Sequence, residues 1–284
     1  MPIRTPLAIA LLTLGACGVS VESGGADSAV PRDAGPGHSV LDAGPTLTDA
    51  GGSLDAGSLV DSGTLDAGGA ADGGLRDPVL FIHGVNGSAA DWATMISRFK
   101  ALGYPSERLM ARTFADPKYG CNTDNAATMQ MWANELMATT HTTRIDLVAH
   151  SMGTLSSRRF LKDLGGTASV NTFVSLGGMN HGLTGLVCLG ATNPLPYPPS
   201  CTFKEICATQ PFIAALNASP ATPGPSVWVT IAGSADQTVP NDSTFLVGAE
   251  NIVVQGVTHS GAMGLQEDQT VFNDVVRVLG YSGH

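Results

Sequence analysis

The sequence predicts an α/β protein with a mostly parallel sheet of about six strands and helices on both faces. Two observations lead to this class. The composition changes sharply near residue 77, and from residue 78 onward short apolar segments alternate with helix-forming segments. Ligands of such sheets bind at the carboxyl ends of the strands, so reactive residues are expected in the loops after each strand.

The expected elements follow one another as a repeated strand–helix unit. The first helix has a clear start, because Ser88 can serve as its N-cap and Asp91 stands three residues further on, close to a capping box. Strands are expected at residues 79–82, 109–114, 144–149, 170–176, 227–232 and 251–255, and helices at 88–102, 126–140, 152–164 and 269–279.

Residues 1–17 have the pattern of a lipoprotein-type export signal. A positive charge at Arg4 precedes a short apolar run, which is too short to span a membrane, and small residues lead to Cys17. The position of Cys17 resembles a lipobox, so we expect a lipidated, membrane-anchored bacterial lipoprotein. Gly18 in the next position is compatible with the outer membrane or the cell surface. The alternative is an ordinary signal peptide in which Cys17 is incidental.

Residues 18–77 are expected to form a disordered acidic linker. They hold ten acidic and two basic residues, a net charge of −8, and repeat the phrase Asp-Ala-Gly without any aromatic residue. Such a segment buries too little apolar surface to offset its chain entropy. A calcium-binding β-roll is the alternative, but it requires a strict nonapeptide period that this segment lacks.

Residues 78–284 are expected to form one catalytic domain, which we predict to be monomeric. They hold fourteen acidic and eleven basic residues, a net charge of −3, within the chain total of −10. This near-neutral balance gives no basic surface for nucleic acid.

The cysteines of this domain form an even set in a protein that is expected to be exported. Disulfides are therefore predicted, and four cysteines allow three pairings. Zinc is the competing interpretation, but no CxxC pair and no histidine at ligand spacing accompanies them, so no metal and no cofactor are expected. The four residues are Cys121, Cys188, Cys201 and Cys207.

The strand at residues 144–149 leads directly into Ala149-His150-Ser151-Met152-Gly153, where a helix begins. A strand–serine–helix turn with small flanking residues is typical of a nucleophile elbow, which predicts Ser151 as a nucleophile. The alternative is a serine that only caps a helix.

Two backbone amides are expected to stabilise the oxyanion that an attack by Ser151 creates. The Met152 N–H stands at the start of the helix, and the Val85 N–H belongs to the loop His83-Gly84-Val85-Asn86-Gly87 after the first strand. The glycines of this loop permit close approach of the backbone to a substrate oxygen. His83 is expected to orient this loop and to line the substrate site.

A serine nucleophile needs a base, which is expected at His259, in the loop after the last strand. His181, after the strand at 170–176, is the rival base. His181 and His150 are otherwise expected to line the substrate site. His141 ends a helix, and His38 and His284 lie outside the expected site.

The acid that orients the base should follow the strand at residues 227–232. Asp236 occupies this position. The rival is Asp242, in what resembles the start of a helix, where an acidic residue is an ordinary capping feature.

Together these motifs resemble the class 2 lipases, small secreted bacterial enzymes. The resemblance rests on Val79–Gly87, Asp146–Gly153, Val174–Gly182 and the loops of Asp236 and His259, and it covers residues 78–280 in matching order. Ala149 in place of the usual first glycine is itself common in that family. The resemblance implies a compact α/β-hydrolase fold, hydrolysis of carboxylic esters including acylglycerols, and no metal. It implies Ser151, Asp236 and His259 as the triad, and Val85 and Met152 as oxyanion donors.

Residues 183–225 are longer than in the smallest members of that family. We interpret them as a disulfide-stiffened cap edge over the acyl pocket, bridged by Cys188 and Cys201. The alternative is a stapled surface loop with no role in substrate choice.

Two other functions remain open at this level. A short-chain carboxylesterase or polyester hydrolase would use the same triad. A binding lipoprotein on an inactive hydrolase scaffold would need no triad at all, whereas this sequence retains every expected element of one.

Overall fold

The computed structural model describes residues 76–185, 187–188 and 200–280. The predicted export signal, the lipidation site Cys17, His38, most of the linker and His284 lie outside the described residues. In the part of the chain that the structure describes, no helix is both long enough and apolar enough to cross a membrane.

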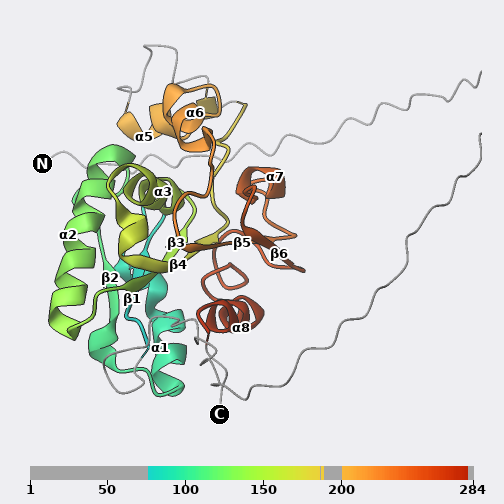
Figure 1. Cartoon of the computed structure of the whole chain (residues 1–284). Helices are drawn as coiled ribbons and strands as arrows, with labels where there is room; N and C mark the ends of the chain where they lie inside the picture. The colour runs from blue at the N-terminus through green and yellow to red at the C-terminus, as the bar shows by residue number, and fades with distance from the viewer. Residues whose placement is uncertain (1–75, 186, 189–199, 281–284) are drawn as a thin grey trace, which may run out of the picture. The chain divides into compact units, whose positions relative to one another are not determined.

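Six strands form one sheet in the order β2-β1-β3-β4-β5-β6, and every neighbouring pair is parallel (Figure 1). The predicted α/β class is therefore confirmed. The strands are β1 (Val79–Ile82), β2 (Leu109–Arg112), β3 (Ile145–His150), β4 (Val170–Leu176), β5 (Val227–Gly233) and β6 (Glu250–Val254).

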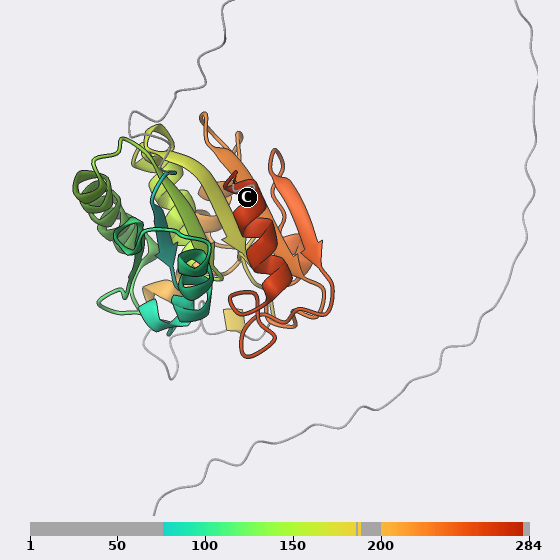
Figure 2. The same ribbon diagram turned by 90° about the horizontal axis from the view of Figure 1, so that it is seen from below.

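Helices cover both faces of this sheet. In Figure 2 the last helix, drawn in red, lies across the sheet. The helices are α1 (Ala93–Ala101), α2 (Asn122–Thr140), α3 (Gly153–Asp163), α5 (Cys201–Glu205), α6 (Pro211–Asn217), α7 (Asn241–Thr244) and α8 (Gln269–Val278), with 3-10 turns η1 (Ala89–Trp92), η2 (Ser106–Arg108) and η3 (Gly166–Ala168).

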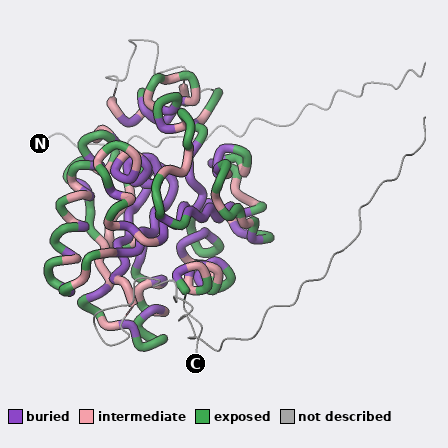
Figure 3. The backbone as a smooth tube through the Cα atoms, in the orientation of Figure 1, coloured by how far each residue is buried: buried purple, intermediate pink, exposed green. Residues whose placement is uncertain are grey.

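The alternation of side chains along each strand divides the core into two layers. In β1, Val79 and Phe81 pack with α1 and α8, whereas Leu80 and Ile82 pack with α2 and α3. All four residues of β1 are fully buried, as expected for a central strand of a parallel sheet. Buried residues accordingly concentrate along the strands between the helices (Figure 3).

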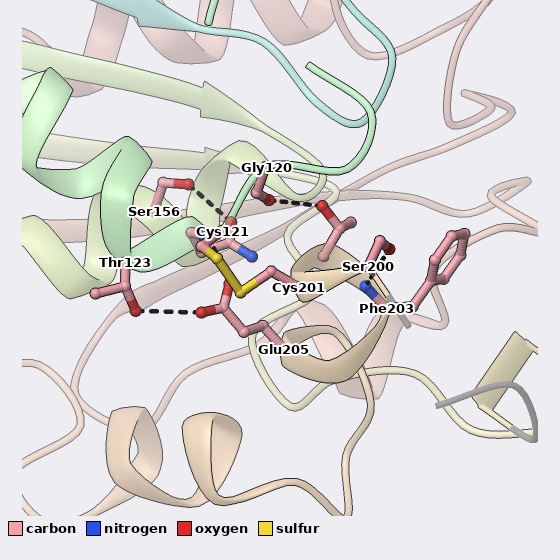
Figure 4. Close-up of a disulfide and its surroundings, with 10 residues drawn as sticks. Gly120, Cys121, Thr123, Ser156, Ser200, Cys201, Phe203 and Glu205 are labelled. Carbon is pink, nitrogen blue, oxygen red and sulfur yellow. Dashed lines mark hydrogen bonds between the residues drawn. A yellow bond between two sulfur atoms is a disulfide. The ribbon is translucent and has the colours of Figure 1, made fainter. Parts of the chain in front are cut away.

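Helix α2 begins at Asn122, four residues before the predicted start. The carboxylate of Glu205, from α5, accepts hydrogen bonds from the Asn122 amide and, at 3.1 Å, from the Thr123 hydroxyl (Figure 4). An acid from a distant segment thus satisfies one free amide of the first turn, and its negative charge interacts favourably with the helix dipole. Local sequence alone carries no sign of this cap.

The region between β4 and β5, where no helix is predicted, contains α5 and α6. Ser200 caps α5, since its hydroxyl accepts a hydrogen bond from the Phe203 amide, and Pro211 occupies the first turn of α6. Apolar residues of this region, including Ile213 and Leu216, pack with Leu155 of α3.

The predicted bridge between Cys188 and Cys201 is wrong, because the disulfides are Cys121–Cys201 and Cys188–Cys207. Helix α5 begins at Cys201 and ends before Cys207, so these two cysteines meet different parts of the chain. Its first residue, Cys201, faces the start of α2, where the Thr202 hydroxyl also donates to the Gly120 carbonyl at 2.7 Å (Figure 4). After its end, Cys207 lies beside the segment of Leu183, and the Leu183 amide donates to the Ile206 carbonyl at 2.7 Å.

Loss of the Cys121–Cys201 bridge is expected to destabilise the domain strongly. The bridge spans 80 positions of the sequence, and the chain-entropy model assigns a loop of this length roughly 4 kcal/mol. Thermal or urea unfolding of Cys121→Ser/Cys201→Ser should show this loss. The matched control is Cys188→Ser/Cys207→Ser, whose bridge spans 19 positions and should cost about 1 kcal/mol less. A larger loss in the control would contradict this account.

Candidate active site

Ser151 lies in the sharp turn between β3 and α3, as the sequence predicts. Its backbone has φ +55°, a left-handed conformation that is uncommon for a residue other than glycine. The Ser151 amide donates to the Leu176 carbonyl at 2.9 Å, which ties the turn to β4. Such local strain persists only where the surrounding structure enforces it, and it is frequent in active sites.

Two glycines leave the space that this turn requires. A Cβ atom at Gly153 would stand 2.4 Å from the His83 carbonyl oxygen, and one at Gly84 would stand 2.9 Å from the Ser151 Cβ. The last glycine of the elbow therefore allows α3 to pack against the end of β1, and Gly84 allows the following loop to approach Ser151.

Three residues from separate segments form a hydrogen-bonded chain. The Ser151 Oγ lies 2.9 Å from the His259 Nε2, and the His259 Nδ1 lies 2.7 Å from the Asp236 Oδ2. A carboxylate only accepts, so Nδ1 carries the hydrogen, and Nε2 is left to accept the Ser151 hydroxyl proton. The side chains of Ser151 and His259 are buried, which shields this chain from bulk water.

The environment of Asp236 keeps its carboxylate charged. Burial by itself would raise the pKa, but hydrogen bonds from His259 and from the Val239 and Thr238 amides outweigh it, and the pKa of Asp236 is lowered. Gly177, with φ +52°, lies against the pair: a Cβ there would stand 3.1 Å from the His259 Nδ1. The rival acid Asp242 lies in the first turn of α7, as its capping interpretation predicts.

The two predicted oxyanion donors have unused amides. Among the described residues, neither the Val85 nor the Met152 N–H donates a hydrogen bond. The turn around Val85 is held by the Asn86 amide, which donates to the Pro117 carbonyl at 2.7 Å, and by the Gly87 amide, which donates to Gly84 at 3.2 Å. Free amides in a fixed turn suit the binding of a transient negative oxygen.

His83 orients the loop after β1, as predicted. The prediction that it also lines the substrate site is wrong, because it is not among the residues that line the cleft. It is completely buried, its Nδ1 donates to the Gly84 carbonyl at 2.7 Å, and its Nε2 accepts from the Phe114 amide at 3.1 Å. Both ring nitrogens are thus occupied in joining the loops after β1 and β2, so the ring has no free polar atom for a substrate.

His150 lines the cleft and also supports the loop of His259. Its Nε2 donates to the His259 carbonyl at 2.9 Å, and the two rings lie 4.6 Å apart. Burial, with the nearby His259 as a lesser cause, lowers the pKa of His150 to about 3. The ring is therefore neutral and places no positive charge beside His259.

His181, the rival base, does not line the cleft, and the histidine hydrogen-bonded to Ser151 is His259. The side chain is exposed, and its Nε2 donates to the Phe245 carbonyl at 2.8 Å. The turn at Gly177 and Gly178 carries the chain past the site, so that Met179 is the residue of this loop that lines the cleft. The glycine pair was the only sequence signal for this arrangement.

A cleft of about 660 Å³ opens over Ser151 and His259. Its walls come from the loop after β1 (residues 84–87), from Asp91, and from residues of the loop after His259 (260–262, 264, 266 and 267). The described residues of 183–225 line no part of it, which for them favours the surface-loop alternative over the cap edge. Residues 186 and 189–199 of that segment lie outside the described residues.

One group of side chains in the described part of the chain has the spacing of a metal site: Cys121, Cys201 and Glu205. The two sulfur atoms are joined in the disulfide, so they offer no thiolate ligands. The Glu205 carboxylate is engaged at the start of α2. These residues serve as a covalent and polar clamp between α5 and α2.

Residues 76–279 match the model of a protein family described as lipase (class 2). Similar solved structures include the mature lipase BlEst2 of Bacillus licheniformis, with 18% identity and a TM-score of 0.60 over 72% of this chain and 93% of that one. Aspergillus fumigatus lipase B has 17% identity and a TM-score of 0.58, over 73% and 53%. A thermophilic esterase of Thermogutta terrifontis has 12% identity and a TM-score of 0.54, over 73% and 92%. These likenesses show a shared fold.

Proposed function

The chain belongs to the class 2 lipase family, and from this premise we propose that it hydrolyses carboxylic esters, acylglycerols among them, with a catalytic triad of Ser151, His259 and Asp236. One observation carries the proposal: the three side chains form a continuous hydrogen-bonded chain at the wall of a cleft large enough for a small ester. The solved structures of similar fold are named as lipases and an esterase, which supports the same reaction class.

The reaction proceeds in two halves. The Ser151 Oγ attacks the ester carbonyl carbon while His259 Nε2 takes the hydroxyl proton, and the amides of Val85 and Met152 hold the oxygen that becomes negative. His259 then gives the proton to the departing alcohol oxygen, which leaves an acyl group on Ser151. Water, deprotonated by the same imidazole, attacks the acyl group and releases the carboxylic acid. Asp236 keeps the imidazole in the required tautomer.

A fluorophosphonate probe tests this proposal directly, because it phosphonylates only an activated serine. The wild-type protein should be labelled at Ser151 and should hydrolyse p-nitrophenyl butyrate. The control His181→Ala removes a histidine that lies outside the cleft and should keep both properties. A folded wild-type protein that neither reacts nor hydrolyses the ester would support the alternative of a binding lipoprotein on an inactive scaffold.

A short-chain carboxylesterase with the same triad is the second candidate. Carboxylates of Asp91 and Glu267 line the cleft beside its apolar residues, and such charges favour short, water-soluble esters over long acyl chains. Rates on p-nitrophenyl esters from acetate to palmitate separate the two candidates. A maximum at two to four acyl carbons would support the carboxylesterase, and a maximum at eight or more would support the lipase.

A further inference from the structure

The cleft contains a polar group of residues that the proposed reaction does not use. Gln266 and Glu267 line it together with Asp91, and among the described lining residues there is no lysine or arginine. His150 adds no charge, since its ring is neutral. The cleft therefore presents carboxylates that no cation of its own wall neutralises.

Gln266 has an unused hydrogen-bond donor. The residue is only 7% exposed, and its buried amide nitrogen has no hydrogen-bond partner among the described residues. Buried polar atoms are nearly always paired in folded proteins. An unpaired donor on a residue that lines a substrate cleft indicates a partner that arrives with the substrate.

Glu267 is half-buried, and its carboxylate has no hydrogen-bond or ion-pair partner among the described residues. Arg98 reaches the same segment, but its guanidinium donates to the Asp268 carbonyl oxygen at 3.1 Å. The Asp268 carboxylate in turn caps α8, because it accepts from the Thr270 and Val271 amides. Glu267 is thus an acceptor that its neighbours leave open.

The loop that carries both residues is held in place by its own backbone. The Thr258 amide donates to Met263 at 2.9 Å, the Leu265 amide to Thr258 at 3.1 Å, and the Glu267 amide to Gly264 at 2.9 Å. A Cβ at Gly264 would stand 2.5 Å from the Ser260 Cα, so the loop closes tightly on itself. Glu267 is therefore positioned before a substrate binds, whereas the buried Gln266 amide must turn toward the cleft to reach a substrate.

The position of this loop relates it to the alcohol part of the ester. His259 must deliver its proton to the departing alcohol oxygen, so the alcohol lies on the imidazole side of the cleft. The loop of Gln266 and Glu267 follows His259 directly in the chain and lines the same cleft.

We propose that Gln266 and Glu267 form a subsite for the alcohol portion of uncharged esters that carry free hydroxyl groups, such as partially acylated polyols. The Gln266 amide donates to a hydroxyl oxygen, and the Glu267 carboxylate accepts from a hydroxyl. Glu267 and Asp91 together repel an alcohol portion that bears a carboxylate. This inference rests on the proposed ester hydrolysis and specifies its substrate class.

Three butyrate esters that differ only in the alcohol test the subsite: glycerol monobutyrate, propyl butyrate and the anionic 3-butyryloxypropanoate. The wild-type kcat/KM should be highest for the glycerol ester. Gln266→Leu, which removes one neutral hydrogen bond, should lower the ratio of the glycerol to the propyl ester roughly threefold to tenfold. Glu267→Gln should lower that ratio and should raise the rate on the anionic ester relative to the propyl ester by a similar factor.

Matched controls make the same chemical changes outside the cleft. Gln269→Leu and Glu107→Gln alter exposed side chains that do not line it, so they should keep all ratios of the wild-type protein. Because Gln266 is buried, thermal unfolding is measured for each variant; if Gln266→Leu does not fold, the half-exposed Glu267→Gln decides the question alone. Wild-type ratios in every folded cleft variant would overturn the subsite. If the wild-type protein hydrolyses none of the three esters, the proposed function itself fails.

Discussion

Ser151→Ala is expected to lower kcat on p-nitrophenyl butyrate by a factor on the order of 10⁵ to 10⁶, as the loss of a serine nucleophile does in other hydrolases. In the proposed reaction the attacking hydroxyl is that of Ser151, which is hydrogen-bonded to His259. The variant should also lose fluorophosphonate labelling. Steady-state kinetics at saturating ester and mass spectrometry of the labelled protein measure the two effects.

The fold should survive this change, because alanine removes one oxygen and keeps the Cβ that packs against Gly84. A thermal unfolding curve close to that of the wild-type protein would show that the loss is chemical. Ser97→Ala, on the exposed face of α1, is the matched control and should retain full activity and labelling. Retention of activity in folded Ser151→Ala would remove the residue from the mechanism.

Asp236→Asn is expected to lower kcat by roughly 10⁴ while the backbone around the site is kept. The carboxylate oxygen 2.7 Å from the His259 Nδ1 only accepts, and this fixes the tautomer in which Nε2 receives the serine proton. An amide in its place can present a donor and thereby favour the opposite tautomer. It also removes the negative charge that stabilises the imidazolium formed during the attack.

The matched control for this variant is the rival acid. Asp242→Asn changes a carboxylate in the first turn of α7 and should leave kcat within about twofold of the wild-type value, since a surface substitution of this kind costs little. An equal loss of activity in both variants, or a loss confined to Asp242→Asn, would show that the acid is assigned incorrectly.

Asp236→Asn should also change how the unfolding free energy depends on pH. The pKa of Asp236 is lowered in the folded protein, so its ionised form contributes stability above the ordinary range of an aspartate, near 3.9, and this contribution is lost as the pH falls through the lowered pKa. The difference in unfolding free energy between the wild-type protein and Asp236→Asn should therefore narrow in acid. Urea unfolding at pH 7 and pH 3 measures the change.

Much of the catalytic arrangement could be predicted from short-range patterns. A buried parallel strand is an apolar run, and a serine between the small residues Ala149 and Gly153 after such a run is typical of a sharp turn, so Ser151 and the order of its partners were visible along the chain. The structure then brings the side chains of Ser151, His259 and Asp236 into hydrogen-bond contact.

The sequence did not predict which histidines line the cleft. His83, His150 and His181 all follow strands near the expected site, yet only His150 lines the cleft. The difference depends on the direction of each side chain and on distant partners, such as the Phe114 amide for His83 and the Phe245 carbonyl for His181. Sequence spacing carries no information about either.

The sequence by itself determined the class of fold, the order of its strands and the candidate nucleophile, base and acid, because each of these depends on patterns within a few residues. Only the tertiary structure decided the pairing of the cysteines, the early start of α2 under Glu205, and the meeting of Gln266 and Glu267 with Ser151 in one cleft. These contacts join segments many residues apart. They arise when helices and loops pack on the sheet, and a local pattern does not encode which distant segments will meet.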